Sequence, residues 1–188
     1  MTPAPSHSSA TETDTATDSH ATADRLQQVA DYLCAHALVL TTAESCTAGL
    51  IAAHLADVPG AGKSLESAFV VYSPEAKQRH LAVKLETIER HNLTSEPVAC
   101  EMARGALRNS DANLAIANTG VTDDTDPAIE PGTQCFAWCF AARDTLPEKT
   151  FSETRRFSGD RNAIREQAAL HALTRIPLWH ARWREAGA

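Results

Sequence analysis

The chain has 188 residues, 43% of them hydrophobic, and a formal net charge of −7 at pH 7. This length suffices for one domain with a substantial buried core, so we expect a single domain with tails. The acidic balance argues against a protein that holds nucleic acid, because neutralising phosphates requires a basic face.

Neither a membrane nor an oxidising compartment is indicated by the sequence. No apolar stretch approaches the ~20 residues of a transmembrane helix, and the N-terminus lacks the basic-then-apolar layout of a signal peptide. The five cysteines lie mostly in apolar or small-residue segments and are interpreted as reduced, buried thiols. Cys135 and Cys139 are four residues apart, but no second pair or nearby His completes a zinc site. We therefore expect a cytoplasmic protein without a bound metal.

Residues 1–23 are mostly Ser, Thr, Ala and Asp, with almost nothing to bury, and are predicted to be a disordered tail. From Asp24, a candidate N-cap, apolar residues recur with helical spacing, which predicts a first helix that ends near His36. The apolar run at 38–40 predicts the first strand. Its continuous apolarity is typical of a strand that is covered on both faces.

The chain then turns from strand to helix within residues 39–53, V-L-T-T-A-E-S-C-T-A-G-L-I-A-A. A strand that ends at Glu44 and a helix from Thr47 to Ala56 would place Ser45 in the bend. The first free amides of a helix lie there, and they can hold an anion or an oxyanion. A serine in this position is a candidate nucleophile, but it needs a base and an oxyanion site. The alternative is that Ser45 and Thr47 simply cap the helix.

Residues 67–73, S-A-F-V-V-Y-S, predict the second strand, and Pro74 begins a short helix behind it. Tyr72 then ends the strand and Lys77 lies on the first turns of the helix. Strand ends and helix starts meet at one edge of an α/β sheet, so both side chains are candidates to face Ser45. Lys77 is the available base if its amine is desolvated. The alternatives are a solvated strand tyrosine and an ordinary surface lysine.

The rest of the chain continues the alternation of helices and strands. The expected elements are two helices within 87–107, a third strand at 114–121, a polar loop at 122–133, a fourth strand at 135–142, a half-exposed fifth strand at 151–157, and a long helix from about 158 to Pro177. Residues 177–188 are expected to be a tail or a short helix. Trp179 and Trp183 within it suit either an interface between copies or the domain's own core.

Five segments, in order, carry a resemblance to a known family. They are A-E-S-C-T-A-G at 43–49, V-V-Y-S-P-E-A-K at 70–77, T-S-E-P-V-A-C-E-M-A-R-G-A at 94–106, N-T-G at 118–120 and F-S-G-D-R-N-A-I-R at 157–165. Together they resemble the CinA C-terminal domain, a family that includes stand-alone nicotinamide-nucleotide amidohydrolases. The resemblance runs from about Leu26 to Leu173. It implies a three-layer α/β/α sandwich, which we assign to residues 24–176.

The resemblance also implies a reaction, the deamidation of nicotinamide mononucleotide to nicotinate mononucleotide and ammonia, without a metal or cofactor. Ser45 matches the family's nucleophilic serine, and Tyr72 and Lys77 match its Y-S-x-x-x-K motif. In that mechanism Lys77 takes the hydroxyl proton and Tyr72 assists the transfer. Amides near residues 47–49 hold the oxyanion.

The implied substrate-binding residues are Thr47, Ala48, Gly49, Thr119, Gly120 and Arg161. Arg161 is the candidate for the nucleotide phosphate, because arginine pairs well with phosphate. The alternative is a residue at a helix start that pairs with Asp160 or Glu166. Members of the family tend to self-associate, so the expected partners are a small nucleotide substrate and further copies of this chain, as a homodimer or a higher homo-oligomer.

The sequence departs from the family pattern at Ala48, where Gly is usual, at Pro74, where Asn is usual, and in one loop. The glycine-rich T-G-x-A-G-P-x-G of the family is here T-G-V-T-D-D-T-D-P, so Asp123, Asp124 and Asp126 replace small neutral residues. These charges repel a phosphate if the loop borders the site; the alternative is a solvated loop folded away from it.

Two classes of function follow. The first is a working amidohydrolase on nicotinamide mononucleotide or a related amide. The second is a non-catalytic or re-purposed member that keeps the fold for binding or regulation.

Overall fold

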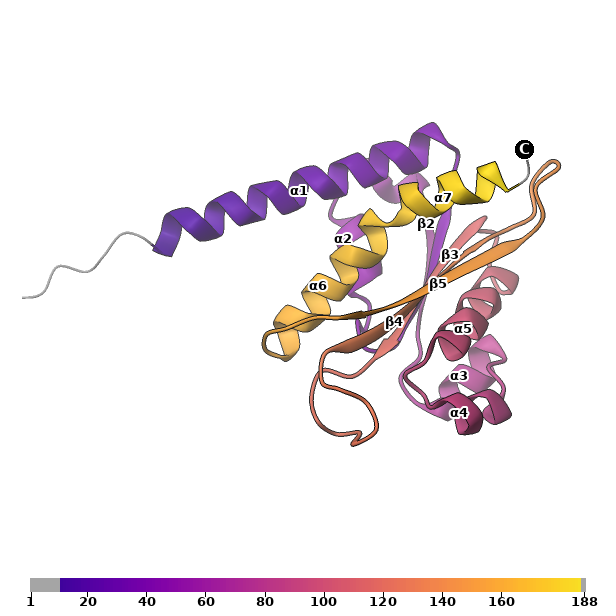
Figure 1. The fold of residues 1–188 in the computed structure, drawn as a ribbon. Helices are drawn as coiled ribbons and strands as arrows, with labels where there is room; N and C mark the ends of the chain where they lie inside the picture. Colours follow the sequence, from indigo (N-terminus) through magenta and orange to yellow (C-terminus); the bar gives the residue numbers. More distant parts are fainter. Residues whose placement is uncertain (1–10, 187–188) are drawn as a thin grey trace, which may run out of the picture.

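A five-stranded sheet with helices on both faces forms the body of the protein in this computed structural model, which describes residues 11–186 and the side chains from residue 20 onward (Figure 1). The elements in chain order are α1 (Thr11–Ala35), β1 (Leu40–Glu44), α2 (Leu50–Ala56), a short 3-10 helix (Ala61–Lys63), β2 (Leu65–Val70), α3 (Pro74–Leu81), α4 (Leu85–His91), α5 (Glu96–Arg108), β3 (Leu114–Gly120), β4 (Thr133–Phe140), β5 (Lys149–Arg156), α6 (Arg161–Thr174) and α7 (Ile176–Glu185).

The sheet is mixed, with the strand order β2-β1-β3-β4-β5. β1 pairs in parallel with both β2 and β3, whereas β4 is antiparallel to β3 and to β5. Every residue of β1 is buried, as the continuous apolar run before it suggested. β1 and β2 therefore end at the same edge of the sheet, and the segments that follow them can meet there.

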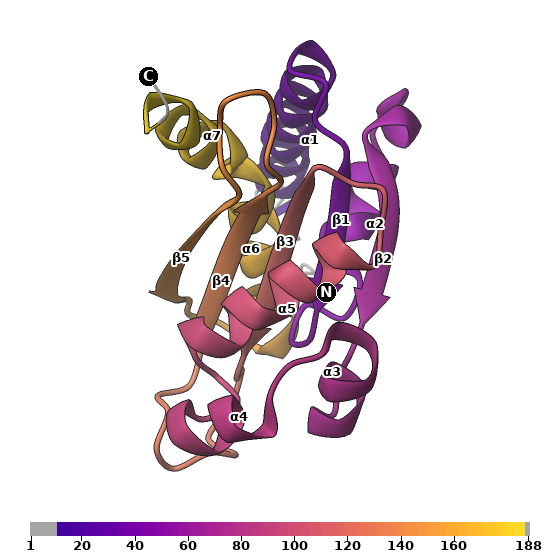
Figure 2. The same cartoon turned by 90° about the vertical axis from the view of Figure 1, so that its right-hand side faces the viewer.

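Helices α1, α2, α6 and α7 cover one face, and α3, α4 and α5 cover the other, so the predicted three-layer α/β/α fold is confirmed (Figures 1 and 2). The alternation of β4 shows the division clearly. Phe136, Trp138 and Phe140 enter the core under the first group of helices. The small side chains of Cys135, Ala137 and Cys139 face the second group.

The N-terminal end of the chain departs from the sequence-based expectation. α1 begins at Thr11 rather than at Asp24, so residues 11–23, predicted to be disordered, form its first half; residues 1–10 lie outside the described residues. Extending a helix that already exists gains one backbone hydrogen bond for each residue fixed, and this cooperativity does not show in local composition. At the C-terminal end, the short helix that was one of the two expectations is present as α7; α6 already ends at Thr174, and Pro177 lies in the first turn of α7. A missing amide hydrogen costs little there.

Smaller corrections concern β1, α2 and one cysteine. β1 starts only at Leu40, and α2 starts at Leu50 because the bend occupies more residues than expected. All five cysteines are free, and Cys34 is exposed rather than buried.

The tryptophans of α7 belong to the domain's own core. Trp179 and Trp183 are buried, and they stack on Phe151 and Phe140 respectively.

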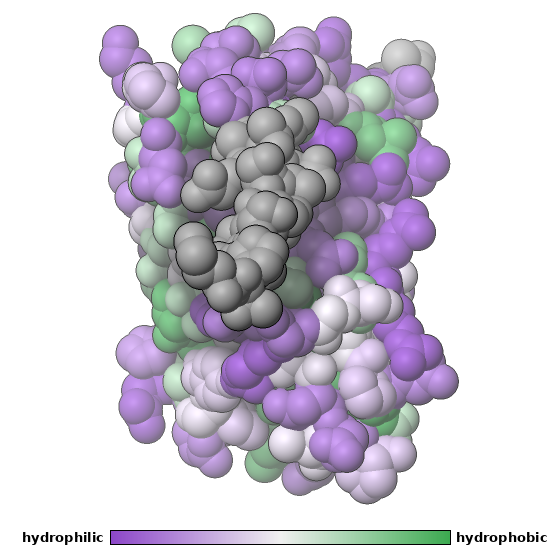
Figure 3. Space-filling view, turned by 90° about the vertical axis from the view of Figure 1, so that its left-hand side faces the viewer, coloured by the Kyte–Doolittle hydropathy of each residue, from purple (hydrophilic) through white to green (hydrophobic). Residues whose placement is uncertain are grey.

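The surface seen from the free end of α1 is mainly hydrophilic, with apolar residues scattered between polar ones (Figure 3). Within residues 11–186, no helix combines the length and apolar character needed to span a bilayer.

Candidate active site

The bend between β1 and α2 is organised by Glu44, whose carboxylate is fully buried. It accepts hydrogen bonds from Thr42 Oγ1 (2.9 Å) and from the amides of Gly49 (2.8 Å), Ile51 (3.1 Å) and Ala52 (3.0 Å). A negative charge at a helix N-terminus is favourable, and here the last residue of the strand supplies it. Left-handed backbone at Ala48 (φ 50°) and Gly49 (φ 97°) allows the chain to turn back over this carboxylate.

The amides that we expected to hold an oxyanion are already engaged. Thr47 donates to Asn118 Oδ1 (3.1 Å), Ala48 to the carbonyl of Ser45 (3.2 Å) and Gly49 to Glu44. These hydrogen bonds give the assignment for residues 47–49 no support. Within the described part of the chain, the amide of Cys46 donates no hydrogen bond, which leaves it as the available donor beside Ser45.

Ser45 and Lys77 are in direct contact. Lys77 Nζ lies 2.9 Å from Ser45 Oγ, and it also lies 2.8 Å from the carbonyl oxygen of Val71 and 2.9 Å from that of Tyr72. The side chain is completely buried, and this burial lowers the pKa of Lys77 from 10.5 to about 8. When the amine is neutral, its two hydrogens satisfy the two carbonyls and its lone pair faces the Ser45 hydroxyl. Lys77 is therefore not an ordinary surface lysine, and it is placed to act as a base.

The parallel pairing of β1 with β2 brings the two residues together. Glu44, the last residue of β1, is in register with Val70, the last residue of β2. Ser45, directly after β1, therefore lies beside the turn that leads from β2 into α3. Ser73 caps α3 by accepting a hydrogen bond from the amide of Ala76 (3.1 Å), and this cap fixes the first turn that carries Lys77.

Tyr72 lies at the site, but its hydroxyl does not reach the serine and lysine. The side chain is 58% exposed, and its hydroxyl accepts a hydrogen bond from Arg161 Nη2 (3.0 Å). Among the described residues, no hydrogen bond joins that hydroxyl to Ser45 or Lys77. The expected part of Tyr72 in proton transfer has no support in this geometry. Its backbone carbonyl, rather than its phenol, holds the base.

A cavity of about 180 Å³ opens beside Ser45. Of the predicted binding residues, Thr119, Gly120 and Arg161 line it, whereas Thr47, Ala48 and Gly49 do not. The sequence did not single out the other lining residues, which include Cys46, Leu93, Val121 and Thr122. Leu93 comes from the turn before α5, and no local pattern distinguishes it from a core leucine.

The acidic loop after Gly120 borders this cavity through Asp123, and is not folded away from it. Arg161 Nη1 contacts Asp123 Oδ2 (3.1 Å) and Thr122 Oγ1 (2.8 Å). Hydrogen bonding from Thr125 and, less strongly, the charge of Arg161 lower the pKa of Asp123. Asp126, in the same loop, has a different partner: its carboxylate accepts a hydrogen bond from Asn92 Nδ2 (2.8 Å).

The alternative partners of Arg161 are occupied elsewhere. Asp160 caps α6 by accepting from the amide of Ala163 (2.8 Å), and Glu166 pairs with His54 (2.7 Å).

Three polar residues that the sequence did not single out hold the bend in place. The backbone carbonyl of Asn118 accepts a hydrogen bond from the amide of Ser45 (3.0 Å), and its side-chain Nδ2 donates to Gln134 Oε1 (3.0 Å). Arg165 donates from Nε to the carbonyl of Cys46 (3.0 Å), and its Nη2 donates to the carbonyl of Thr47 (3.1 Å). Asn118 and Arg165 lie inside two of the family-like segments, and Gln134 interrupts an apolar strand. These were the only sequence signals for their role.

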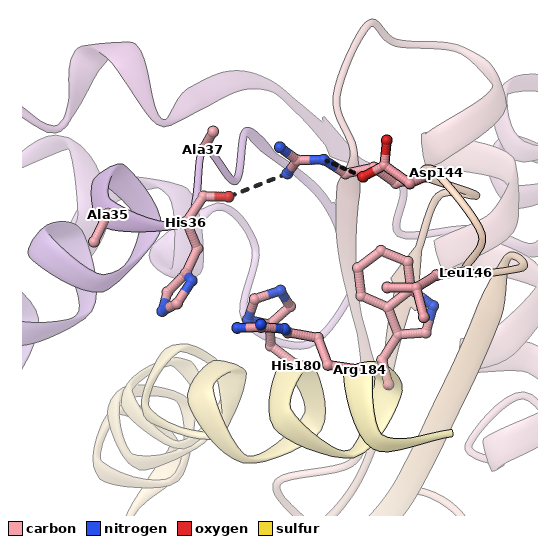
Figure 4. A pocket seen from close by; sticks show the side chains of 9 residues that line it. Ala35, His36, Ala37, Asp144, Leu146, His180 and Arg184 are labelled. Atoms are coloured by element: carbon pink, nitrogen blue, oxygen red, sulfur yellow. Dashed lines mark hydrogen bonds and ion pairs between the residues drawn. The ribbon is translucent and has the colours of Figure 1, made fainter. Parts of the chain in front are cut away.

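A larger cavity of about 360 Å³ lies at the opposite end of the sheet, between the end of α1 and α7 (Figure 4). Two of its ionisable side chains have partners within the fold: Arg143 donates to the carbonyl of His36 (3.2 Å), and His180 Nδ1 contacts the hydroxyl of Tyr32 (2.9 Å). Burial lowers the pKa of His180 to about 4. The residues that line this cavity offer no activated nucleophile, so the smaller cavity beside Ser45 is the candidate active site.

Comparisons with known proteins agree with the segments noted in the sequence. The sequence profile of the CinA C-terminal domain matches residues 22–178. The nicotinamide-nucleotide amidohydrolase PncC of Escherichia coli K12 is 40% identical over 157 residues, which cover 81% of this chain and 90% of that protein. A competence-damage inducible protein of Symbiobacterium thermophilum is 42% identical over 155 residues. This match covers 80% of the present chain but only 36% of the longer relative.

Solved structures give the same result for the fold. The crystal structure of a CinA superfamily protein from Escherichia coli superposes with a TM-score of 0.77 at 31% identity, covering 84% of this chain and 90% of that one. A competence damage-inducible protein A from Klebsiella pneumoniae superposes with a TM-score of 0.79 at 32% identity, covering 86% and 98%. The profile match, the relatives and the superpositions cover the same body of the protein, and the chain belongs to the CinA C-terminal domain family.

Proposed function

We propose that this chain is an amidohydrolase that deamidates nicotinamide mononucleotide, with Ser45 as nucleophile and Lys77 as its base. The observation that carries the proposal is the 2.9 Å contact between Ser45 Oγ and the buried Lys77 Nζ. An unassisted hydroxyl is a weak nucleophile, and a desolvated amine within hydrogen-bond reach is the activation that it needs. The relative named nicotinamide-nucleotide amidohydrolase supports the choice of substrate.

The proposed reaction has two halves. Ser45 Oγ attacks the carboxamide carbon while its proton moves to Lys77, and the resulting oxyanion accepts a hydrogen bond from the amide of Cys46. The carbon–nitrogen bond then breaks, and ammonia leaves with the proton that Lys77 returns. Water, deprotonated by Lys77, attacks the ester on Ser45, which releases the carboxylic acid as its carboxylate and restores the serine hydroxyl.

The cavity beside Ser45 suits an aromatic carboxamide. Leu93 and Val121 contribute apolar side chains to its lining, and Thr119 and Thr122 contribute polar ones. In this proposal Tyr72 forms one wall of the cavity and takes no proton.

A re-purposed, non-catalytic member of the family is the second candidate. The ion pair between Asp123 and Arg161 favours it, because this pair occupies the cation that we expected to receive the phosphate.

Ammonia release from nicotinamide mononucleotide by the purified chain separates the two candidates. We expect release by the wild-type protein and its loss in Ser45→Ala. No release by the wild type, or equal release by Ser45→Ala, contradicts the first candidate and leaves the second.

The remaining expectations are part of the same proposal. Residues 24–176 carry the activity, in the cytoplasm, and the chain forms a homodimer or a higher homo-oligomer. Light scattering after size-exclusion chromatography tests the assembly, and a monomer at micromolar concentration contradicts it.

A further inference from the structure

The cavity beside Ser45 contains one cation and one anion among the residues that line it, Arg161 and Asp123. These two residues are bound to each other at 3.1 Å. The cavity therefore presents no net charge from its lining to an incoming ligand. A phosphate group needs the opposite arrangement, an arginine with free hydrogen-bond donors.

Arg161 has no terminal nitrogen left without a partner. Its Nη1 donates to Thr122 and Asp123, and its Nη2 donates to the hydroxyl of Tyr72. Asp123 is itself held in place, because its Oδ1 accepts from Thr125 Oγ1 (2.8 Å). Both members of the pair are thus held by further hydrogen bonds, so the contact between them in the cavity lining is a positioned one.

The neighbouring cations cannot replace Arg161. Arg165 is committed to the carbonyls of Cys46 and Thr47, and Lys77 is committed to Ser45 and two carbonyls. A ligand phosphate that pairs with Arg161 therefore competes with Asp123 for the guanidinium and lies beside the negative charge of Asp123.

We propose that Asp123 is a specificity-determining residue that occupies Arg161 as an internal anion. It lowers the affinity of the site for phosphorylated amides relative to the corresponding uncharged nucleoside amides. The substrates that the site accepts therefore include the nucleoside carboxamide as well as the mononucleotide. This inference rests on the proposed function for the identity of the amide, but it concerns binding and can be tested without turnover.

The chain offers a matched control in Asp124. This residue is the next along the same loop, it is exposed, and it forms no hydrogen bond or ion pair with another part of the chain described by the structure. Asp123→Asn and Asp124→Asn remove the same charge from adjacent positions. Only the first removes the anion that contacts Arg161.

The experiment is calorimetric titration of nicotinamide mononucleotide and nicotinamide riboside into Ser45→Ala, alone and combined with Asp123→Asn or Asp124→Asn. Removing a competing charge within a few ångströms of a phosphate that carries up to two charges gives a gain of about tenfold at low salt. We expect this gain for the mononucleotide with Asp123→Asn, a change of less than about twofold for the riboside, and little change with Asp124→Asn. The gain should shrink in high salt, because both side chains are about half exposed.

Three results overturn the proposal: no gain in affinity for the mononucleotide with Asp123→Asn, which includes no measurable binding; an equal gain for both ligands; or an equal gain with Asp124→Asn. Ammonia release by the wild type is measured separately. If it is absent while Asp123→Asn selectively tightens mononucleotide binding, the proposed function fails and the assignment of Asp123 stands.

Discussion

Gly105 in α5 lies against the backbone of Leu81, the last residue of α3, so closely that a Cβ atom on Gly105 would be 2.0 Å from the Leu81 carbonyl oxygen. Helix α3 carries Lys77, and the close approach of the two helices fixes its position. A glycine here serves packing, since its backbone is ordinary helix.

Gly105→Ala is expected to destabilise the fold by about 1–3 kcal/mol, the usual cost of overpacking, because the clash is with backbone and a rotamer change cannot relieve it. Urea denaturation measures this change. Gly62→Ala is the matched control, because a Cβ at Gly62 meets nothing within 4 Å. Equal free energies of unfolding for the two variants would show that α3 and α5 have room to separate.

Lys77→Met is expected to lower kcat/KM for amide hydrolysis by at least about 100-fold, since it removes the base from Ser45. In the wild type, kcat/KM should rise about tenfold per pH unit up to about pH 8, the pKa of Lys77, and level off above it. Lys84→Met, at an exposed position, is the control for the loss of a lysine. A flat profile between pH 6 and 9 would remove Lys77 from the role of base.

The same lysine predicts a change in stability that does not depend on activity. The pKa of Lys77 is about 8 in the folded chain and 10.5 in the unfolded reference, so the unfolded chain holds more protons between these values. The free energy of unfolding should therefore rise with pH in this window, by up to about 3 kcal/mol. Lys77→Met should lack this rise, and a variant that retains it would assign the effect to another group.

Glu44→Gln is expected to cost about 1–3 kcal/mol of stability and to lower kcat. Each carboxylate oxygen of Glu44 accepts two hydrogen bonds. In either orientation, the NH₂ group of a glutamine amide would therefore face two donors that it cannot accept from. The bend that holds Ser45 would then loosen. Glu89→Gln, exposed on α4, is the control in the same urea and kinetic measurements. Wild-type stability in Glu44→Gln would mean that the α2 amides find other acceptors.

Acid should destabilise the protein through His180. Burial, then the charges of His36, Arg184 and Arg143, lower its pKa from 6.5 to about 4. Its contribution to stability is complete above pH 6.5 and is lost as the pH falls toward 4, by up to about 3 kcal/mol. His180→Gln should flatten this part of the curve of unfolding free energy against pH. His91→Gln on α4 should keep the wild-type slope, and equal slopes for both variants would contradict the assignment.

The sequence predicted the elements that depend on local pattern. The Ser45 bend, the strand before Tyr72 and the turn of helix that carries Lys77 follow from apolar runs, Pro74 and a capping serine. The pairing of two parallel strands then places Ser45 near Lys77, because their C-terminal ends lie at one edge of the sheet.

What the sequence did not predict depends on contacts between distant residues. Nothing local shows that Glu44 turns back to cap α2, or that Arg165, 119 residues beyond Cys46, binds its carbonyl. The direction of the Tyr72 phenol toward Arg161 depends on a helix near the other end of the chain. Family resemblance pointed to Tyr72, which lines the candidate cavity, and gave it a role in proton transfer that the position of its hydroxyl does not support.

Strand β2 is at an edge of the sheet, and the carbonyls of Val71 and Tyr72 that hold Lys77 come directly after it. An edge strand opens locally at a lower free energy than the whole domain unfolds. Local opening of β2 would separate Lys77 from Ser45 and expose the Lys77 amine to water, which raises its pKa toward the ordinary value. We therefore expect the contact between Ser45 and Lys77 to be lost on heating before the sheet behind it unfolds.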